Sequence, residues 1–97
     1  MPKHNADELH ELSLRSTLRN HAITHLRVRR HAQLLVLESG PEDDPIPHAR
    51  FRRQAVHIWT LELPSHTGRW DKTPYRGLID NMLAVLETEM PWTLAPI

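Results

Sequence analysis

Four arginines are the strongest candidates for chemistry in this sequence, because they occur in two Arg-x-Arg pairs that alternate with apolar residues. One pair lies in HLRVRR (25–30) and the other in HARFRR (48–53). Alternation with a period of two is typical of a half-buried strand, so each pair is predicted to project from the solvent face of its strand. If the two strands flank a third, all four guanidinium groups lie within about 10 Å of one another. This candidate anion-binding set is Arg27, Arg29, Arg50 and Arg52.

Two interpretations of the arginine set are open. Clustered positive charges repel one another unless a negative charge neutralises them, and a phosphate backbone or an acidic partner would supply that charge. Alternatively, Glu38, Glu62 or the acidic loop 42–44 of the chain itself neutralises them. We favour this structural answer, because twelve basic and twelve acidic residues leave a formal net charge of zero. The position of the loop relative to the arginines decides between the two.

The histidines are numerous, with eight in 97 residues. His21 and His25 stand four positions apart, a spacing that places two imidazoles on one face of a continuous helix, as metal sites can require. However, a strand is predicted to begin at His25, and zinc needs three or four converging ligands. We therefore expect no metal site and no cofactor, with His21 and His25 as the only weak metal candidates.

Tryptophan is the other residue type with chemical potential here. Trp59 and Trp70 flank a predicted hairpin turn, PSHTG (64–68), and in an exposed groove they would stack nucleic-acid bases. Such large rings are more often part of a core. We predict one core in which both rings meet residues of the last helix. Its members are Phe51, Trp59, Leu61, Trp70, Met82 and Leu86.

Composition excludes several classes of function. The chain has no cysteine, which excludes disulfides, thiolate catalysis and cysteine-based zinc sites. Its three glycines are scattered and form no phosphate loop, and no serine lies in a nucleophile motif. The longest aliphatic run, Leu34 to Leu37, is far too short to span a bilayer. We expect a soluble cytoplasmic protein.

The pattern along the chain predicts a single α+β domain over residues 1–97. We expect an N-terminal helix, an antiparallel meander sheet of about five short strands, and a C-terminal helix packed on one face. Residues 1–8 offer nothing to bury and are expected to be disordered. Thr73-Pro74 is predicted to start the last helix, and Trp92 to anchor the tail. The other predicted elements are a helix over about 6–24 and strands over 25–30, 33–38, 48–53, 56–63 and 69–72.

The central stretch resembles an uncharacterised family of short bacterial proteins that is known only as a domain of unknown function. The resemblance covers roughly residues 25–92, the sheet plus the C-terminal helix. It supports the fold and implies no activity. The residues that carry it are Pro45, Pro47, Ala49-Arg50-Phe51-Arg52, Trp59-Thr60-Leu61, Arg69-Trp70, Pro74 and Trp92.

The sequence alone leaves the function unknown, and three hypotheses follow in order of preference. The first is a small non-enzymatic module for binding or protein interaction, whose partner is another protein or a second copy of the chain. The second is polyanion or nucleic-acid binding through the arginine-lined face, which the neutral charge disfavours. The third is a small toxin-type ribonuclease that uses Arg and His as its acid–base pair. No hypothesis involves a membrane.

Overall fold

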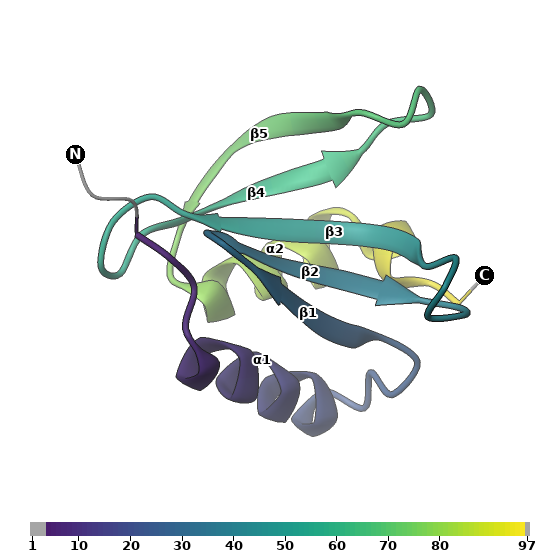
Figure 1. Cartoon of the computed structure of the whole chain (residues 1–97), viewed down its shortest axis with the longest axis horizontal. Coiled ribbons are helices and arrows are strands. Elements are labelled where there is room, and N and C mark those ends of the chain that lie inside the picture. Colours follow the sequence, from purple (N-terminus) through teal and green to yellow (C-terminus); the bar gives the residue numbers. More distant parts are fainter. Residues whose placement is uncertain (1–3, 97) are drawn as a thin grey trace.

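A helix, five strands and a second helix follow one another along the chain in the computed structural model, which describes residues 4–96. The strands form one antiparallel sheet in chain order, joined by short connections (Figure 1). This confirms the predicted α+β fold with a meander sheet. The elements are α1 (Glu8–Asn20), β1 (Arg27–His31), β2 (Leu34–Ser39), β3 (Ile46–Arg53), β4 (Trp59–Pro64), β5 (Trp70–Gly77), α2 (Ile79–Glu89) and the 3-10 helix η1 (Pro91–Leu94).

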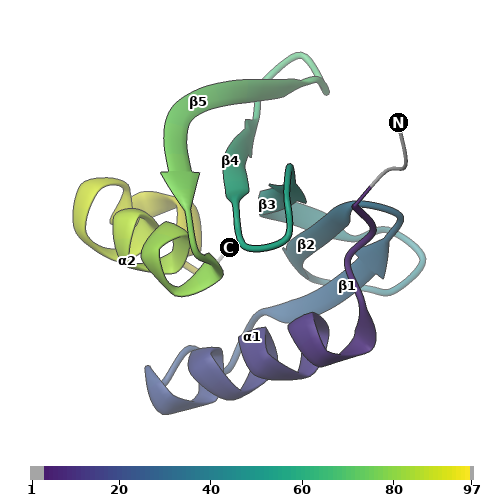
Figure 2. The same ribbon diagram turned by 90° about the vertical axis from the view of Figure 1, so that its left-hand side faces the viewer.

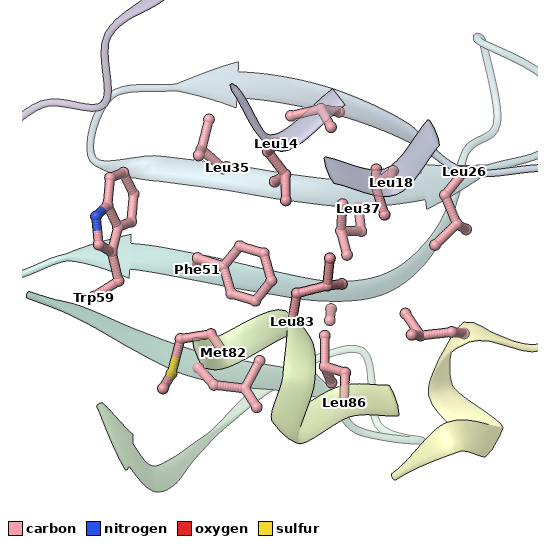
Figure 3. Close-up of a cluster of buried hydrophobic side chains, with 14 of the residues drawn as sticks. Leu14, Leu18, Leu26, Leu35, Leu37, Phe51, Trp59, Met82, Leu83 and Leu86 are labelled. Carbon is pink, nitrogen blue, oxygen red and sulfur yellow. The ribbon is translucent and has the colours of Figure 1, made fainter. Parts of the chain in front are cut away.

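Both helices cover the same face of the sheet (Figure 2). Most apolar strand side chains point toward them, and Phe51 and Leu61 are fully buried there, whereas Val36 and Trp70 lie on the opposite face. Between helix and sheet lies one hydrophobic core, which includes Trp59 (Figure 3). Within residues 4–96, no helix lies over the opposite face of the sheet. Among the core residues, the helices contribute Leu14, Leu18, Met82, Leu83 and Leu86.

The start of α1 is tied to the body of the protein. The side chain of Asp7 accepts a hydrogen bond from the backbone N–H of His10, and the His10 ring accepts one from Asp7. Burial lowers the pKa of His10, which favours the neutral ring that this acceptor role needs. Ala6 is buried and its N–H donates to Ala32. The expectation of disorder over residues 1–8 is therefore wrong from Ala6 onward, and residues 1–3 lie outside the described part.

The predicted start of the last helix at Thr73-Pro74 is wrong. These residues belong to β5, which continues to Gly77, and α2 begins at Ile79. The hydroxyl of Thr73 does not cap a helix, because it donates to the carbonyl of Leu61 at 2.8 Å. The register between β4 and β5 also shifts beside Thr73 and Pro74. An edge strand tolerates proline at such a bulge, since no ladder hydrogen bond is lost there.

Two of the three tryptophans lie where the sequence did not predict them. Trp70 is half-buried on the uncovered face, because it stands opposite Pro64 in the register. Trp92 is 68% exposed and does not anchor the tail. Leu94, 8% exposed, takes that role. The tail is fixed further by His48 and His25, whose rings bond to the carbonyls of Thr93 and Leu94.

The turn between β1 and β2 allows a direct test of backbone strain. Ala32 has a φ of +51°, a left-handed conformation that favours glycine. We expect Ala32→Gly to stabilise the protein by about 0.5–1 kcal/mol in urea unfolding. The matched control is Ala84→Gly in α2, which should cost about 1 kcal/mol. A loss of stability in both variants would contradict the assigned turn.

Candidate functional site

A row of side chains crosses the uncovered face of the sheet from β1 to β5. Arg29 stands opposite Val36, which stands opposite Arg50 on β3. Arg50 in turn faces Glu62 on β4, and Glu62 faces Lys72 on β5. Because directly opposite residues in an antiparallel sheet project from the same face, these five side chains share one surface.

Glu62 lies at the centre of an arginine–carboxylate triad on this face. Its side chain is buried, although no helix covers it. Arg50 donates from Nε to Oε1 of Glu62 at 2.5 Å, and Arg52 donates from Nε to Oε2 at 2.9 Å. Each carboxylate oxygen therefore has its own guanidinium partner. Such charge-assisted bonds fix both arginine side chains in place.

Glu38 forms a second triad with the arginines of β1. Arg29 Nε lies 3.2 Å from both carboxylate oxygens, and Arg27 Nε lies 3.6 Å from Oε1. The guanidinium group of Arg27 also donates to the carbonyls of Gly40 and Pro41, so the loop contributes backbone oxygens. Within residues 4–96, the acids at 42–44 form no ion pair with an arginine. All four predicted arginines thus lie on one face, where they form ion pairs with Glu38 and Glu62.

Lys72 and Arg76 also belong to this face and were missed from the sequence, and Trp70, which was predicted in the core, lies here as well. The ring of Trp70 has the guanidinium carbon of Arg50 4.3 Å from its centroid, a cation–π contact. Lys72 stands opposite Glu62, and Arg76 stands opposite Thr60. The available sequence signal was that Trp70 and Lys72 stand two positions apart, which places both side chains on one face of a strand. It was lost because Thr73-Pro74 resembles a helix start.

Charge is strongly segregated on this neutral protein. Six cationic side chains of the strands share the uncovered face with two carboxylates, an excess of four positive charges. On the other side of the sheet, α2 carries three acidic residues and no basic one. The cations are Arg27, Arg29, Arg50, Arg52, Lys72 and Arg76.

The weak metal candidates are not brought together. α1 ends at Asn20, so His21 and His25 do not share a helix face. His21 bonds to Glu87 at 2.5 Å, and His25 bonds to the carbonyl of Leu94 at 2.5 Å. Over residues 4–96, no group of three or more His, Asp or Glu side chains is placed to hold a metal ion.

Comparison with known proteins adds no relative: no family model, curated protein or solved structure matches the chain. The resemblance to a bacterial family of unknown function accordingly remains a proposal. No helix in the described part of the chain is long and apolar enough to cross a membrane.

Proposed function

We propose that this protein is a non-enzymatic interaction module, which docks an acidic segment of another protein on the uncovered face of its sheet. The observation that carries this proposal is the excess of four positive charges among the strand side chains of that face, where Glu42 of the β2–β3 loop lines one hollow with Arg27 and Arg29. Each buried carboxylate answers two guanidinium groups, so half of the arginine charge has no counterpart within its triad. An acidic partner would supply the missing negative charge.

The hydrogen-bonding geometry of the arginines supports the same role. Arg29, Arg50 and Arg52 bind their carboxylates through Nε alone. Across residues 4–96, no hydrogen bond uses a terminal Nη group of these three side chains. The terminal edge of a guanidinium group binds a carboxylate in a bidentate manner. The triads therefore hold three such edges in fixed orientations, which lowers the entropic cost of binding.

A carboxylate-bearing partner fits this face better than a nucleic acid. Single-stranded nucleic acids bind through basic grooves in which bases stack on open aromatic rings. Here the guanidinium group of Arg50 lies against the ring of Trp70. That contact occupies one face of the only tryptophan on this surface of the described chain. Binding of a nucleic acid is therefore the alternative outcome of the peptide-binding test.

A second copy of the chain is a less well supported partner. Two carbonyl groups, one on the outer edge of β1 and one in the turn that follows it, already have hydrogen-bond donors from the same chain. Arg15 donates to the carbonyl of Val28, and the N–H of Ala6 donates to that of Ala32. Occupied carbonyls weaken the pairing of this edge with another strand.

One serine–histidine pair has the distances of a catalytic dyad, yet its surroundings support a structural role. Ser39 Oγ lies 2.8 Å from His48 Nε2, and His48 Nδ1 lies 2.7 Å from the carbonyl of Thr93. The ring is 3% exposed and ties η1 to the sheet. A substrate would have little access to a base buried in this way.

Binding to an acidic peptide tests the proposal. A fluorescently labelled glutamate-rich peptide should bind, with an affinity that falls as salt is raised. Lys72→Gln and Arg76→Gln should each weaken binding about two- to fivefold, while the control Arg30→Gln, whose side chain pairs with Glu11 of α1, should not. Equal affinity in all variants would contradict the proposal. Tighter binding of a single-stranded oligonucleotide of the same charge would replace it with the polyanion function.

A further inference from the structure

A concave site lies away from the uncovered face of the sheet, between the last turns of α1 and the start of β1. It is a hollow of about 370 Å³. Its floor is apolar and consists of Leu18, Ile23 and Leu26. Thr24 lines its mouth and is exposed to solvent. A concave apolar floor of this size is typical of sites for small molecules.

Three arginines surround this floor: Arg15, Arg19 and Arg27. Arg15 and Arg19 lie one helical turn apart and so project from the same side of α1. Arg15 pairs with Glu11 at 2.7 Å, and Arg27 bonds to loop carbonyls. None of the ion pairs within residues 4–96 involves Arg19. The hollow therefore combines an apolar floor with unbalanced positive charge.

Three carbonyl groups at the end of α1 are already paired and so add little negative charge to the hollow. The N–H groups of His21, Ala22 and Ile23 donate to carbonyls of the last turn, at 2.9 to 3.0 Å. Such closing bonds satisfy helix-terminal carbonyls that would otherwise repel an anion. In addition, no aromatic ring lines the hollow, so nothing there would stack a nucleobase.

We propose that this hollow binds a small organic carboxylate with an aliphatic tail, the tail on the apolar floor and the carboxylate against Arg19. The amphipathic ligand matches the two halves of the site, since burial of CH₂ groups and a guanidinium–carboxylate pair are both favourable. This hollow is a separate site from the peptide-docking face. The two have a single residue, Arg27, in common.

Octanoate is a suitable probe, with binding followed by backbone amide shifts in NMR titrations. We expect saturable shifts at Leu18, Ile23, Thr24 and Leu26, and no such saturation with acetate, which lacks the tail. Arg19→Gln should weaken octanoate binding about tenfold. Thr24→Phe should abolish it by filling the mouth of the hollow, whereas Lys72→Gln, on the far side of the sheet, should leave it unchanged.

Two further measurements could contradict the proposal. If octyltrimethylammonium binds as tightly as octanoate, the site is merely apolar and the carboxylate assignment is wrong. If Arg19→Gln binds octanoate as tightly as the parent protein, the arginine has no role and the proposal fails. The thermal midpoint of each variant separates lost binding from lost folding. Peptide docking is measured with Lys72→Gln, so either proposal can fail without the other.

Discussion

Replacing Trp59 with alanine is expected to destabilise the protein by about 3–5 kcal/mol, a large share of the stability of a small domain. Its indole is 2% exposed and belongs to the core between the sheet and the helices (Figure 3). The ring of His10 also meets it edge-on, with centroids 5.0 Å apart. Removal of the indole therefore leaves a cavity at the junction of α1 and β4 that its neighbours fill only in part.

Urea unfolding followed by circular dichroism measures this loss without relying on tryptophan fluorescence. The matched control is Trp92→Ala, because Trp92 is 68% exposed and its removal opens no cavity. The control should change the free energy of unfolding by about 0.5 kcal/mol or less. Similar losses in the two variants would show that Trp59 is not the core residue described here.

The second large effect is expected at Glu62. Glu62→Gln should destabilise the protein by about 3 kcal/mol, because it removes the charge that answers Arg50 and Arg52. This figure lies at the lower end for broken buried pairs, since both arginine side chains keep some contact with water. Glu89→Gln, at an exposed position of α2, is the matched control and should have little effect. An unchanged midpoint for Glu62→Gln would mean that the triad adds nothing to stability.

The same triad predicts how stability depends on pH. Burial alone would raise the pKa of Glu62, but the hydrogen bonds and charges of Arg52 and Arg50 outweigh it and lower the pKa. A lowered folded-state pKa means that the unfolded chain binds the proton more readily. The contribution of Glu62 is then complete above about pH 5 and is lost as the pH falls toward the folded-state pKa. Glu62→Gln should show a shallower acid-side loss in denaturation midpoints at pH 3 to 6.

Local patterns were sufficient to predict the order of the elements. Alternation over residues 48–53 identified a strand, and β3 spans Ile46–Arg53, which begins two residues earlier than predicted. The same reasoning failed at Thr73-Pro74, because a hydroxyl followed by proline suits both a helix start and a bulged edge strand. Pairing with β4 decides between them, and pairing is not visible in a local pattern.

The candidate site was also predictable in part from local patterns. Alternation placed Arg27, Arg29, Arg50 and Arg52 on one face, since the side-chain period of a strand is independent of its neighbours. The additions of Trp70, Lys72 and Arg76 depend on the register between β4 and β5, including its shift between Thr60 and Glu62. That shift inserts two residues into β5 and so keeps Lys72 and Arg76 on the same face, but the continuation of the strand through Pro74 to Gly77 required the structure.

Amide shift mapping with a glutamate-rich peptide is the sharpest test of docking on the uncovered face, because it reports which surface the peptide occupies. We expect saturable shifts that follow the strands across the uncovered face (Figure 2), from Arg29 through Arg50 and Arg52 to Lys72 and Arg76. Residues of α2, which lies on the opposite side, should not shift. Shifts confined to the helical side, or none at peptide concentrations near millimolar, would contradict the assignment of this face as the docking surface.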